Sequence, residues 1–298
     1  MTDPLPVASA EGLGFCPARL QRIDSYLDSA ISRQDVPGAA VLVARHGQIA
    51  WRALAGMRDI LVITTPKDQL LFQDLLKDGS QWGIKISYAK QPYPGGLAQA
   101  FIIGKSFVGK DGVCLILGDN VFYGDSLVRL MQKACKRKKG ATVFGYWVKD
   151  PENYGVAEFN SKGNLIKLAE KPKKPKSNYA ITGLYFYDNQ VLDIAEKLKP
   201  SSRGELEITD INKAYLKNES LALEKMGPGF AWLDTGSHDS LLAASNFIET
   251  IESRQGLKIC CPEEIAFKAG WISPTNLKKL AHPLKNNGYG RYLLGLIR

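Results

Sequence analysis

From about residue 57 onward, short apolar runs alternate with segments in which apolar residues recur every three or four positions. This alternation predicts strands separated by amphipathic helices, and it is typical of an α/β fold with a mostly parallel mixed sheet and helices on both faces. Ligands of such sheets bind beyond the carboxyl ends of the strands, where we expect residues 91–96, 119–124 and 232–238 to lie. The predicted strands are "DILVITTP", "IKISYAKQ", "GVCLILGDN" and "ATVFGYWV"; the predicted helices are "DQLLFQDLLKDGSQWG", "GLAQAFIIGKSF" and "DSLVRLMQKACKRK".

Residues 1–55 follow a different pattern. An amphipathic helix after Pro17 and a β-hairpin over residues 39–54 are predicted there. The cations differ as well: the first 66 residues contain six arginines and no lysine, whereas the other 232 contain 27 lysines and six arginines. Because both cations suit an ordinary surface, we interpret the shift as a fusion near residues 54–58. The expected parts are an N-terminal segment, 1–55, and a domain, 56–298.

Composition limits the class of protein. Of the 298 residues, 45% are hydrophobic and 23% charged, as in an ordinary globular protein. No apolar run is long enough to span a bilayer, the N-terminus has no signal-peptide pattern, and the five cysteines are scattered, so we expect a cytoplasmic protein. The formal charge of +9 has local sources at residues 133–140 and 170–179. Because no aromatics alternate with these cations, we do not expect nucleic acid as a partner. Because no apolar run could span a bilayer, we do not expect a membrane as a partner either.

Two aspartates stand directly after apolar strands. Asp119 follows the run in "GVCLILGDN", and Asp234 follows the strand in "GFAWLDTGSH". A carboxylate at the mouth of a core strand needs water, a backbone cap or a cation. Two such carboxylates in one α/β sheet fit a shared Mg²⁺ that bridges phosphates, and a turn or capping role is the alternative. None of the three histidines has the spacing of a zinc site.

An ordered series of motifs runs from about residue 54 to the C-terminus. It includes "LAGMRDILVITTP", "QPYPGGLAQAFIIG", "LILGDNVFYG", "DPENYGVAEF", "EKPKKPKSNYAITGLYFYD", "RGELEITDIN", "AWLDTGSHDSLLAASNF" and "NNGYGRYLL". In order and spacing the series resembles the glucose-1-phosphate thymidylyltransferases of the dTDP-rhamnose pathway. The resemblance implies a Rossmann-like nucleotidyltransferase fold and a reaction in which dTTP and glucose 1-phosphate give dTDP-glucose and pyrophosphate. It also implies a homodimer or homotetramer, formed in part by helices at 239–255 and 276–297.

The resemblance further implies Mg²⁺ as the cofactor and roles for individual residues. Catalysis would consist of positioning the substrates and neutralising charge on phosphate oxygens. The residues implied are Asp119, Asp234 and Lys171 in catalysis, the two aspartates as metal ligands; Gln91 and Gly96 at the thymine base; and Tyr154, Gly155, Glu170 and Tyr185 at the sugar.

The front of the chain departs from the family's pattern. The family's first strand leads into a Gly-x-Gly-Thr-Arg-Leu loop and a Lys-Gln-Leu-Leu-Pro segment, and neither occurs in residues 1–298. Backbone N–H groups of that loop cradle the nucleotide phosphates, and its arginine and the later lysine neutralise them. We therefore expect a sheet without its usual first strand, and weak or absent activity. A non-catalytic sugar-nucleotide-binding protein is one alternative.

A serine hydrolase is the other alternative. Residues 12–56 resemble the opening of β-lactamase-like serine esterases, whose chemistry uses a Ser-x-x-Lys at the start of a helix. The chain contains "SYAK" at 87–90 and "YDN" at 187–189. The first pattern lies in a predicted strand, and no Lys-Thr-Gly or His-x-Gly triplet follows, so this alternative is disfavoured.

Overall fold

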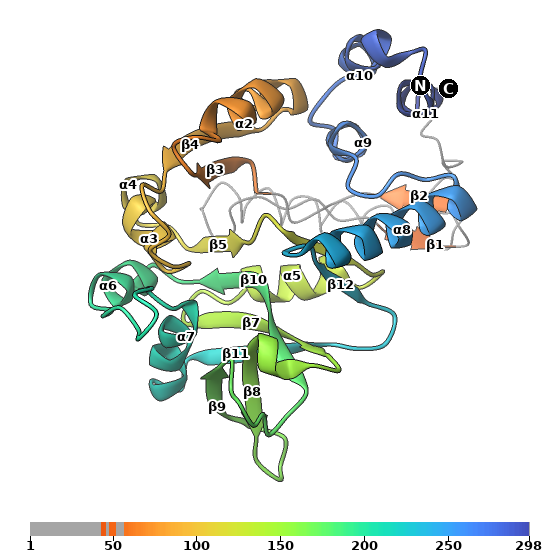
Figure 1. Ribbon diagram of the computed structural model, residues 1–298. Coiled ribbons are helices and arrows are strands. Elements are labelled where there is room, and N and C mark those ends of the chain that lie inside the picture. Colours follow the sequence, from red (N-terminus) through yellow and green to blue (C-terminus); the bar gives the residue numbers. More distant parts are fainter. Residues whose placement is uncertain (1–42, 46–47, 52–56, 298) are drawn as a thin grey trace. The chain divides into compact units, whose positions relative to one another are not determined.

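The computed structural model describes the backbone of residues 43–45 and 48–51 and the chain from 57 to 297 (Figure 1). The helix expected after Pro17 lies outside the described residues. The chain divides into two compact units. Unit 1 comprises Met1–Val62, Asp68–Tyr88 and Gly256–Arg298, and unit 2 comprises Ile63–Lys67 and Ala89–Gln255.

Unit 2 contains the main sheet, whose strand order is β11-β7-β10-β8-β9, with β5 pairing to β10. Strand β10 is antiparallel to β5, β7 and β8, and β8 is antiparallel to β9, whereas β11 and β7 are parallel. The α/β fold with a mixed sheet is confirmed, but the expectation of mostly parallel pairs is wrong for these strands. Strands buried on both faces read as continuous apolar runs in either orientation. The strands are β5 (Val113–Ile116), β7 (Ala141–Trp147), β8 (Gly155–Phe159), β9 (Leu165–Glu170), β10 (Tyr179–Tyr187) and β11 (Leu221–Met226).

Helices cover both faces of this sheet, as predicted (Figure 1). Successive residues of β10 point to opposite faces, so Tyr185 and Tyr187 join one apolar cluster while Leu184 and Phe186 join the other. The first cluster includes residues of four helices and the second includes Ala134 of one helix. The four are α3 (Gln99–Ile103), α4 (Lys105–Val108), α6 (Gln190–Glu196) and α7 (Ile208–Lys217), and the one is α5 (Leu127–Cys135).

A further antiparallel pair of strands involves the residues directly after β5, where the sequence pattern predicts a loop. Strand β6 (Asn120–Tyr123) pairs antiparallel with β12 (Ala231–Asp234). Helix α8 (His238–Gln255) follows β12, close to the bounds expected for 239–255. A short 3-10 helix, η3 (Pro151–Asn153), precedes β8.

Strands β3 (Asp59–Thr64) and β4 (Lys85–Lys90) form a sheet of two. Lys85 N donates to Arg58 O and Gln91 N to Thr64 O, so the strands run parallel. Within the described chain, β3 pairs with β4 alone and β5 with β10 alone. The side chains of β3 are half-buried or exposed rather than buried as predicted, and Ile116 of β5 is 49% exposed. Among the described residues, β3 and β5 are therefore each paired along one edge only.

The hairpin predicted over residues 39–54 is confirmed where the structure describes it. Strand β1 (Val43–Arg45) pairs antiparallel with β2 (Gln48–Trp51), and Arg45 is the partner of Gln48. In the described residues these strands form a separate sheet of two. Within the residues described, β1 and β2 therefore do not extend the sheets that contain β3 and β5.

The C-terminal helices of unit 1 pack around Leu277 and Leu293, which are fully buried, and Trp82 packs against the same cluster. The single helix expected over 276–297 is wrong, because a 3-10 turn containing Pro283 separates two helices and Asn287 caps the second. No helix in the part of the chain described here has the length and apolar character needed to cross a membrane. The helices of unit 1 are α2 (Gln69–Leu76), η2 (Ser80–Trp82), α9 (Pro262–Lys268), α10 (Pro274–Ala281), η4 (His282–Leu284) and α11 (Gly288–Gly295).

Candidate active site

Asp119 and Asp234 come together at the ends of two paired strands. Asp119 immediately precedes β6, and Asp234, the last residue of β12, is the register partner of Asn120. The next residue, Thr235, donates hydrogen bonds from its backbone N and from Oγ1 to the carbonyl oxygen of Asp119, each 2.8 Å long. These bonds hold the two aspartates side by side.

Both carboxylates face the backbone of Gly236. A β-carbon built on Gly236 would lie 3.2 Å from Oδ1 of Asp234 and 3.8 Å from Oδ2 of Asp119. Among the residues described, no group of three or more His, Cys, Asp or Glu side chains forms a metal cage. Two carboxylates with open positions around them are the donor set that suits Mg²⁺, which keeps water and phosphate oxygens as its other ligands. The residues present therefore fit this ion.

An aromatic pair stands beside the carboxylates. The rings of Tyr154 and Trp232 are 5.1 Å apart, and Trp232 also makes an edge contact with Tyr146. Burial, followed by the negative charges of Asp234 and Asp150, raises the pKa of Tyr154. The Tyr154 hydroxyl thus stays protonated at neutral pH and close to Asp234.

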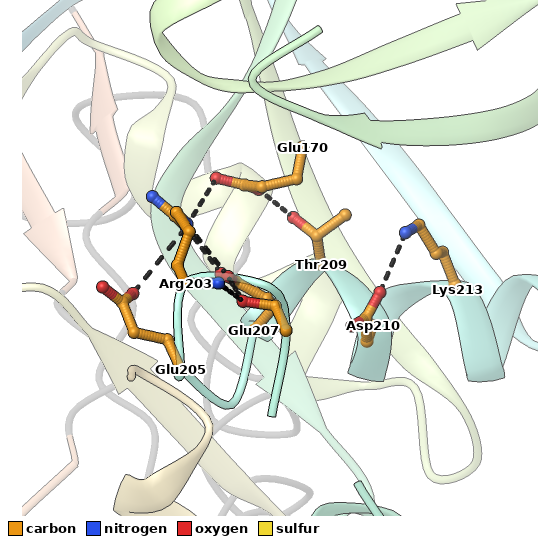
Figure 2. A network of polar contacts seen from close by, with 8 residues as sticks. Glu170, Arg203, Glu205, Glu207, Thr209, Asp210 and Lys213 are labelled. Atoms are coloured by element: carbon orange, nitrogen blue, oxygen red, sulfur yellow. Dashed lines mark hydrogen bonds and ion pairs between the residues drawn. The ribbon is translucent and has the colours of Figure 1, made fainter. Parts of the chain in front are cut away.

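Glu170 lies across the β8–β9 ladder from Gly155. Its Oε2 accepts a 2.5 Å hydrogen bond from Oγ1 of Thr209, the second residue of α7 (Figure 2). A β-carbon on Gly155 would lie 3.1 Å from the Thr209 hydroxyl and 3.3 Å from the Glu170 carboxylate. Gly155 therefore leaves space beside a carboxylate that has a fixed orientation.

Arg203 lies among three carboxylates, as Figure 2 shows. Its Nη2 donates to Oε2 of Glu207 at 2.8 Å and lies 3.7 Å from oxygens of Glu170 and Glu205. Burial opposes ionisation of Glu207, but hydrogen bonds from Arg203 and Ser201 outweigh it and lower the pKa of Glu207. Because Arg203 bonds mainly to Glu207, Oε1 of Glu170 keeps acceptor capacity for a ligand.

Lys171 and Tyr185 lie near the same group of carboxylates. Lys171 is exposed, and its backbone N donates to Tyr154 O at 3.0 Å. Its charge also helps to lower the pKa of Glu207. Tyr185 is buried, and burial, followed by the charges of Glu170 and Asp119, raises its pKa strongly. Tyr185 is therefore a neutral phenol within electrostatic reach of both carboxylates.

Gln91 and Gly96 also lie together. Nε2 of Gln91 donates to Gly96 O at 3.2 Å and to Oε1 of Gln99 at 2.8 Å. Gly96 has a φ of +93°, and a β-carbon there would lie 2.4 Å from Leu206 O. Leu206 N donates to Gly95 O, so the segment that carries Gly96 is bonded to the loop that leads from Arg203 to Thr209.

Sequence patterns alone do not single out four residues of this arrangement. Arg203 and Thr209 occur in the quoted motif "RGELEITDIN", and Asn120 and Trp232 lie in ranges assigned to strand ends. Their roles depend on partners distant in the sequence, such as Glu170 for Thr209, so no local signal assigns them. In unit 2 the structure thus brings Asp119 together with Asp234, Tyr154 with Trp232, Gly155 with Glu170, and Gln91 with Gly96.

The hydrolase alternative fails on geometry. Ser87 and Lys90 lie in β4, where residues three apart point to opposite faces, instead of at a helix start. The Tyr187 hydroxyl is buried and donates to Asn212, and Asn189 donates to the carbonyls of Gly109 and Asp111. These side chains hold the fold together.

Comparison with known proteins identifies the family of this chain. The family model for nucleotidyl transferases matches residues 43–251. The chain is 61% identical over 245 residues to the glucose-1-phosphate thymidylyltransferase of Xanthomonas campestris, covering 82% of this chain and 83% of the relative. It is 55% identical over 245 residues to the enzyme of the same name from Neisseria meningitidis, covering 82% and 85%.

Solved structures agree as well. A glucose-1-phosphate thymidylyltransferase from Bacillus anthracis, solved in complex with a sucrose, aligns with a TM-score of 0.59 and 41% identity over 64% of this chain and 76% of that one. A UDP-glucose pyrophosphorylase complexed with UDP-glucose aligns with a TM-score of 0.56 over 65% and 82%, and at 22% identity it supports the fold alone. From the identity over most of its length and the matching family model, this chain belongs to the glucose-1-phosphate thymidylyltransferase family of nucleotidyl transferases.

Proposed function

We propose that unit 2 binds dTTP and glucose 1-phosphate together with Mg²⁺, and that transfer between them is slow because the phosphate loop is absent. The observation that carries the proposal is the convergence of the Asp119 and Asp234 carboxylates beside Gly236. An aromatic pair on one side and an oriented Glu170 on the other supply the surroundings that a sugar phosphate needs.

At the metal position, Asp119 and Asp234 would be the protein ligands. Mg²⁺ bound there would draw negative charge from the phosphate oxygens of the nucleotide as the new bond forms. Asp119 is exposed, so phosphate oxygens and water have access to the remaining coordination positions. Lys171, also exposed, supplies a second positive charge for a phosphate group.

At the sugar position, Glu170 would accept hydrogen bonds from hydroxyl groups. Its orientation is set by Thr209 before any ligand arrives, which lowers the entropic cost of binding. Gly155 leaves room for the sugar, and Tyr154 and Tyr185, whose pKa values are raised by burial, offer neutral phenols. At the base position, Gln91 and Gly96 would contact thymine through amide and backbone groups.

The rate would be limited by the absence of the family's Gly-rich loop and of the lysine segment that follows it. Removing one preorganised donor at a developing charge costs about 10²–10³ in rate. The one-sided pairing of β3 and β5 in the described chain supports the loss of the strand that would carry such donors. Binding of base, sugar and metal uses other residues and would persist.

Release of pyrophosphate from dTTP and glucose 1-phosphate tests this function. We expect a Mg²⁺-dependent rate at least about 10²-fold below that of the Xanthomonas relative, and its loss in Asp119→Asn and Asp234→Asn. A rate equal to that of the relative would contradict the role given to the missing loop. Release that persists in both variants would contradict the metal site.

Residues 1–55 form a separate N-terminal segment of β-lactamase-like origin, a view supported by the absence of lysine there, while 56–298 form the nucleotidyltransferase domain. The protein assembles as a homodimer or homotetramer, supported by Leu241 and Leu242, which are 51% and 62% exposed on α8. It works in the cytoplasm, supported by cysteines 114, 135, 260 and 261, which are free thiols.

A further inference from the structure

Asn120 has three bonding partners drawn from three different strands or loops. Its Nδ2 donates to Oδ1 of Asp119 at 2.7 Å. Its Oδ1 accepts from the indole Nε1 of Trp232 on β12 at 2.7 Å and from the backbone N of Gly183 on β10 at 2.9 Å. One amide group therefore joins a carboxylate, an aromatic side chain and the main sheet.

The amide of Asn120 has a single workable orientation. Trp232 Nε1 and Gly183 N are both donors, so they require the oxygen of the amide and leave its NH₂ group to face Asp119. An NH₂ group facing a carboxylate makes a charge-assisted hydrogen bond, which is stronger than a neutral one. The two donors thus fix the group that holds Asp119.

Gly183 shows how closely Asn120 is fitted. A β-carbon on Gly183 would lie 2.4 Å from Oδ1 and 2.7 Å from Cγ of Asn120, closer than any real contact. The register of β10 against β7 shifts between Ile181 and Tyr185, so Gly183 lies within an irregular stretch of the strand. Because Gly183 has no side chain, there is room for the Asn120 amide beside β10.

We propose that Asn120 is a positioning residue that holds the Asp119 carboxylate for metal binding and couples it to Trp232 and to β10. The inference rests on the proposed function, because it takes Asp119 as a metal ligand. Groups that hydrogen-bond to a metal-binding carboxylate fix its orientation, and their loss commonly weakens metal affinity 10–100-fold. Asn120 acts through Asp119.

Titration of the protein with Mn²⁺ in the absence of nucleotide, followed by the loss of the free Mn²⁺ signal in electron paramagnetic resonance, tests the proposal without requiring turnover. We expect saturable binding in the wild type, no such binding in Asp119→Asn, and affinity lower by 10–100-fold in Asn120→Ala. Asn189→Ala is the matched control, because that amide also bridges two segments of unit 2, through Gly109 and Asp111, and should leave Mn²⁺ affinity unchanged.

Gly183→Ala is the second variant and keeps every carboxylate and Asn120 itself. Its β-carbon would push the Asn120 amide away from Asp119, so we expect Mn²⁺ affinity to fall in the same range while circular dichroism stays that of a folded chain. Wild-type affinity in folded Asn120→Ala and Gly183→Ala would overturn the role of Asn120 and leave the metal site standing. No saturable binding in the wild type would overturn the metal site and this proposal with it.

Discussion

Asp234 lies directly opposite Asn120 in the antiparallel ladder between β6 and β12. A register partner fixes the separation of two backbones to about 5 Å, so the residue before Asn120 and the end of β12 must lie close together. This pairing, made between segments more than a hundred positions apart, is what turns two separate strand-end aspartates into one site. The metal site proposed for unit 2 depends on it.

Replacing Thr209 with valine tests the orientation of Glu170. Valine keeps the shape but removes the hydroxyl that donates to Glu170 Oε2. Because hydrogen bonds to charged groups contribute about 1.5–3 kcal/mol, we expect the affinity for glucose 1-phosphate to fall about tenfold or more. Calorimetric titration with glucose 1-phosphate measures this affinity. Affinity for dTTP should not change, and an equal fall for both ligands would argue for a general loss of structure.

Gly96→Ala tests the close approach of the 95–98 segment to Leu206. A β-carbon at 96 would lie 2.4 Å from Leu206 O, and the φ of +93° adds backbone strain. We expect the free energy of unfolding to fall by more than about 1 kcal/mol and dTTP binding to weaken. Gly163→Ala is the control, since its φ is +79° but nothing lies within 4 Å of the new carbon. Equal losses in the two variants would show that the contact with Leu206 is unimportant.

Glu207→Gln tests the ion pair with Arg203 through its pH dependence. The pKa of Glu207 is lower in the folded state than the usual 4.5, so its ionised form stabilises the fold above that pH, and this stabilisation is lost as pH falls through the folded-state value. At pH 7 we expect the variant to be less stable by about 1.5–3 kcal/mol.

The difference between Glu207→Gln and the wild type should shrink as denaturant unfolding is repeated at pH values below 4.5. Glu205→Gln serves as the control, because Glu205 is 39% exposed and 3.7 Å from Arg203 and should change stability less. A difference for Glu207→Gln that does not depend on pH would contradict the role of the charge.

Thr182→Val should stabilise the protein. The Thr182 side chain is fully buried in β10, and its Oγ1 has no hydrogen-bond partner among the described residues. Valine has the same shape without an unsatisfied polar atom, so we expect the free energy of unfolding to rise by about 1 kcal/mol. Thermal or denaturant unfolding measures this change. A loss of stability would show that the hydroxyl has a partner.

Local patterns predicted the elements better than their pairing. The strands at 85–90 and 141–147 and the helix at 127–135 follow from apolar periodicity, and each occurs in the structure. The antiparallel direction of β10 could not be predicted, because its residues are buried on both faces and form one continuous apolar run. Pairing of β6 with β12 depends on contacts between distant segments, which periodicity does not encode.

The residues of the candidate site likewise include some that sequence features indicate and others that only the fold reveals. Asp119 and Asp234 could be found because each follows an apolar strand, and the other positions were found through the resemblance of ordered motifs. Thr209, Arg203 and Asn120 could not, because their importance arises from bonds to Glu170, Glu207 and Trp232 that only the fold creates.

Calorimetric titration with dTDP-glucose and Mg²⁺ tests most directly the claim that unit 2 retains a binding site for base, sugar and metal without the phosphate loop. This ligand needs the base and sugar positions but carries no triphosphate. We expect saturable binding at one site per chain, and weaker binding in Glu170→Gln. Binding should depend on Mg²⁺ in the wild type but not in Asp119→Asn. The absence of binding by a folded chain, or binding that none of these changes affects, would contradict it.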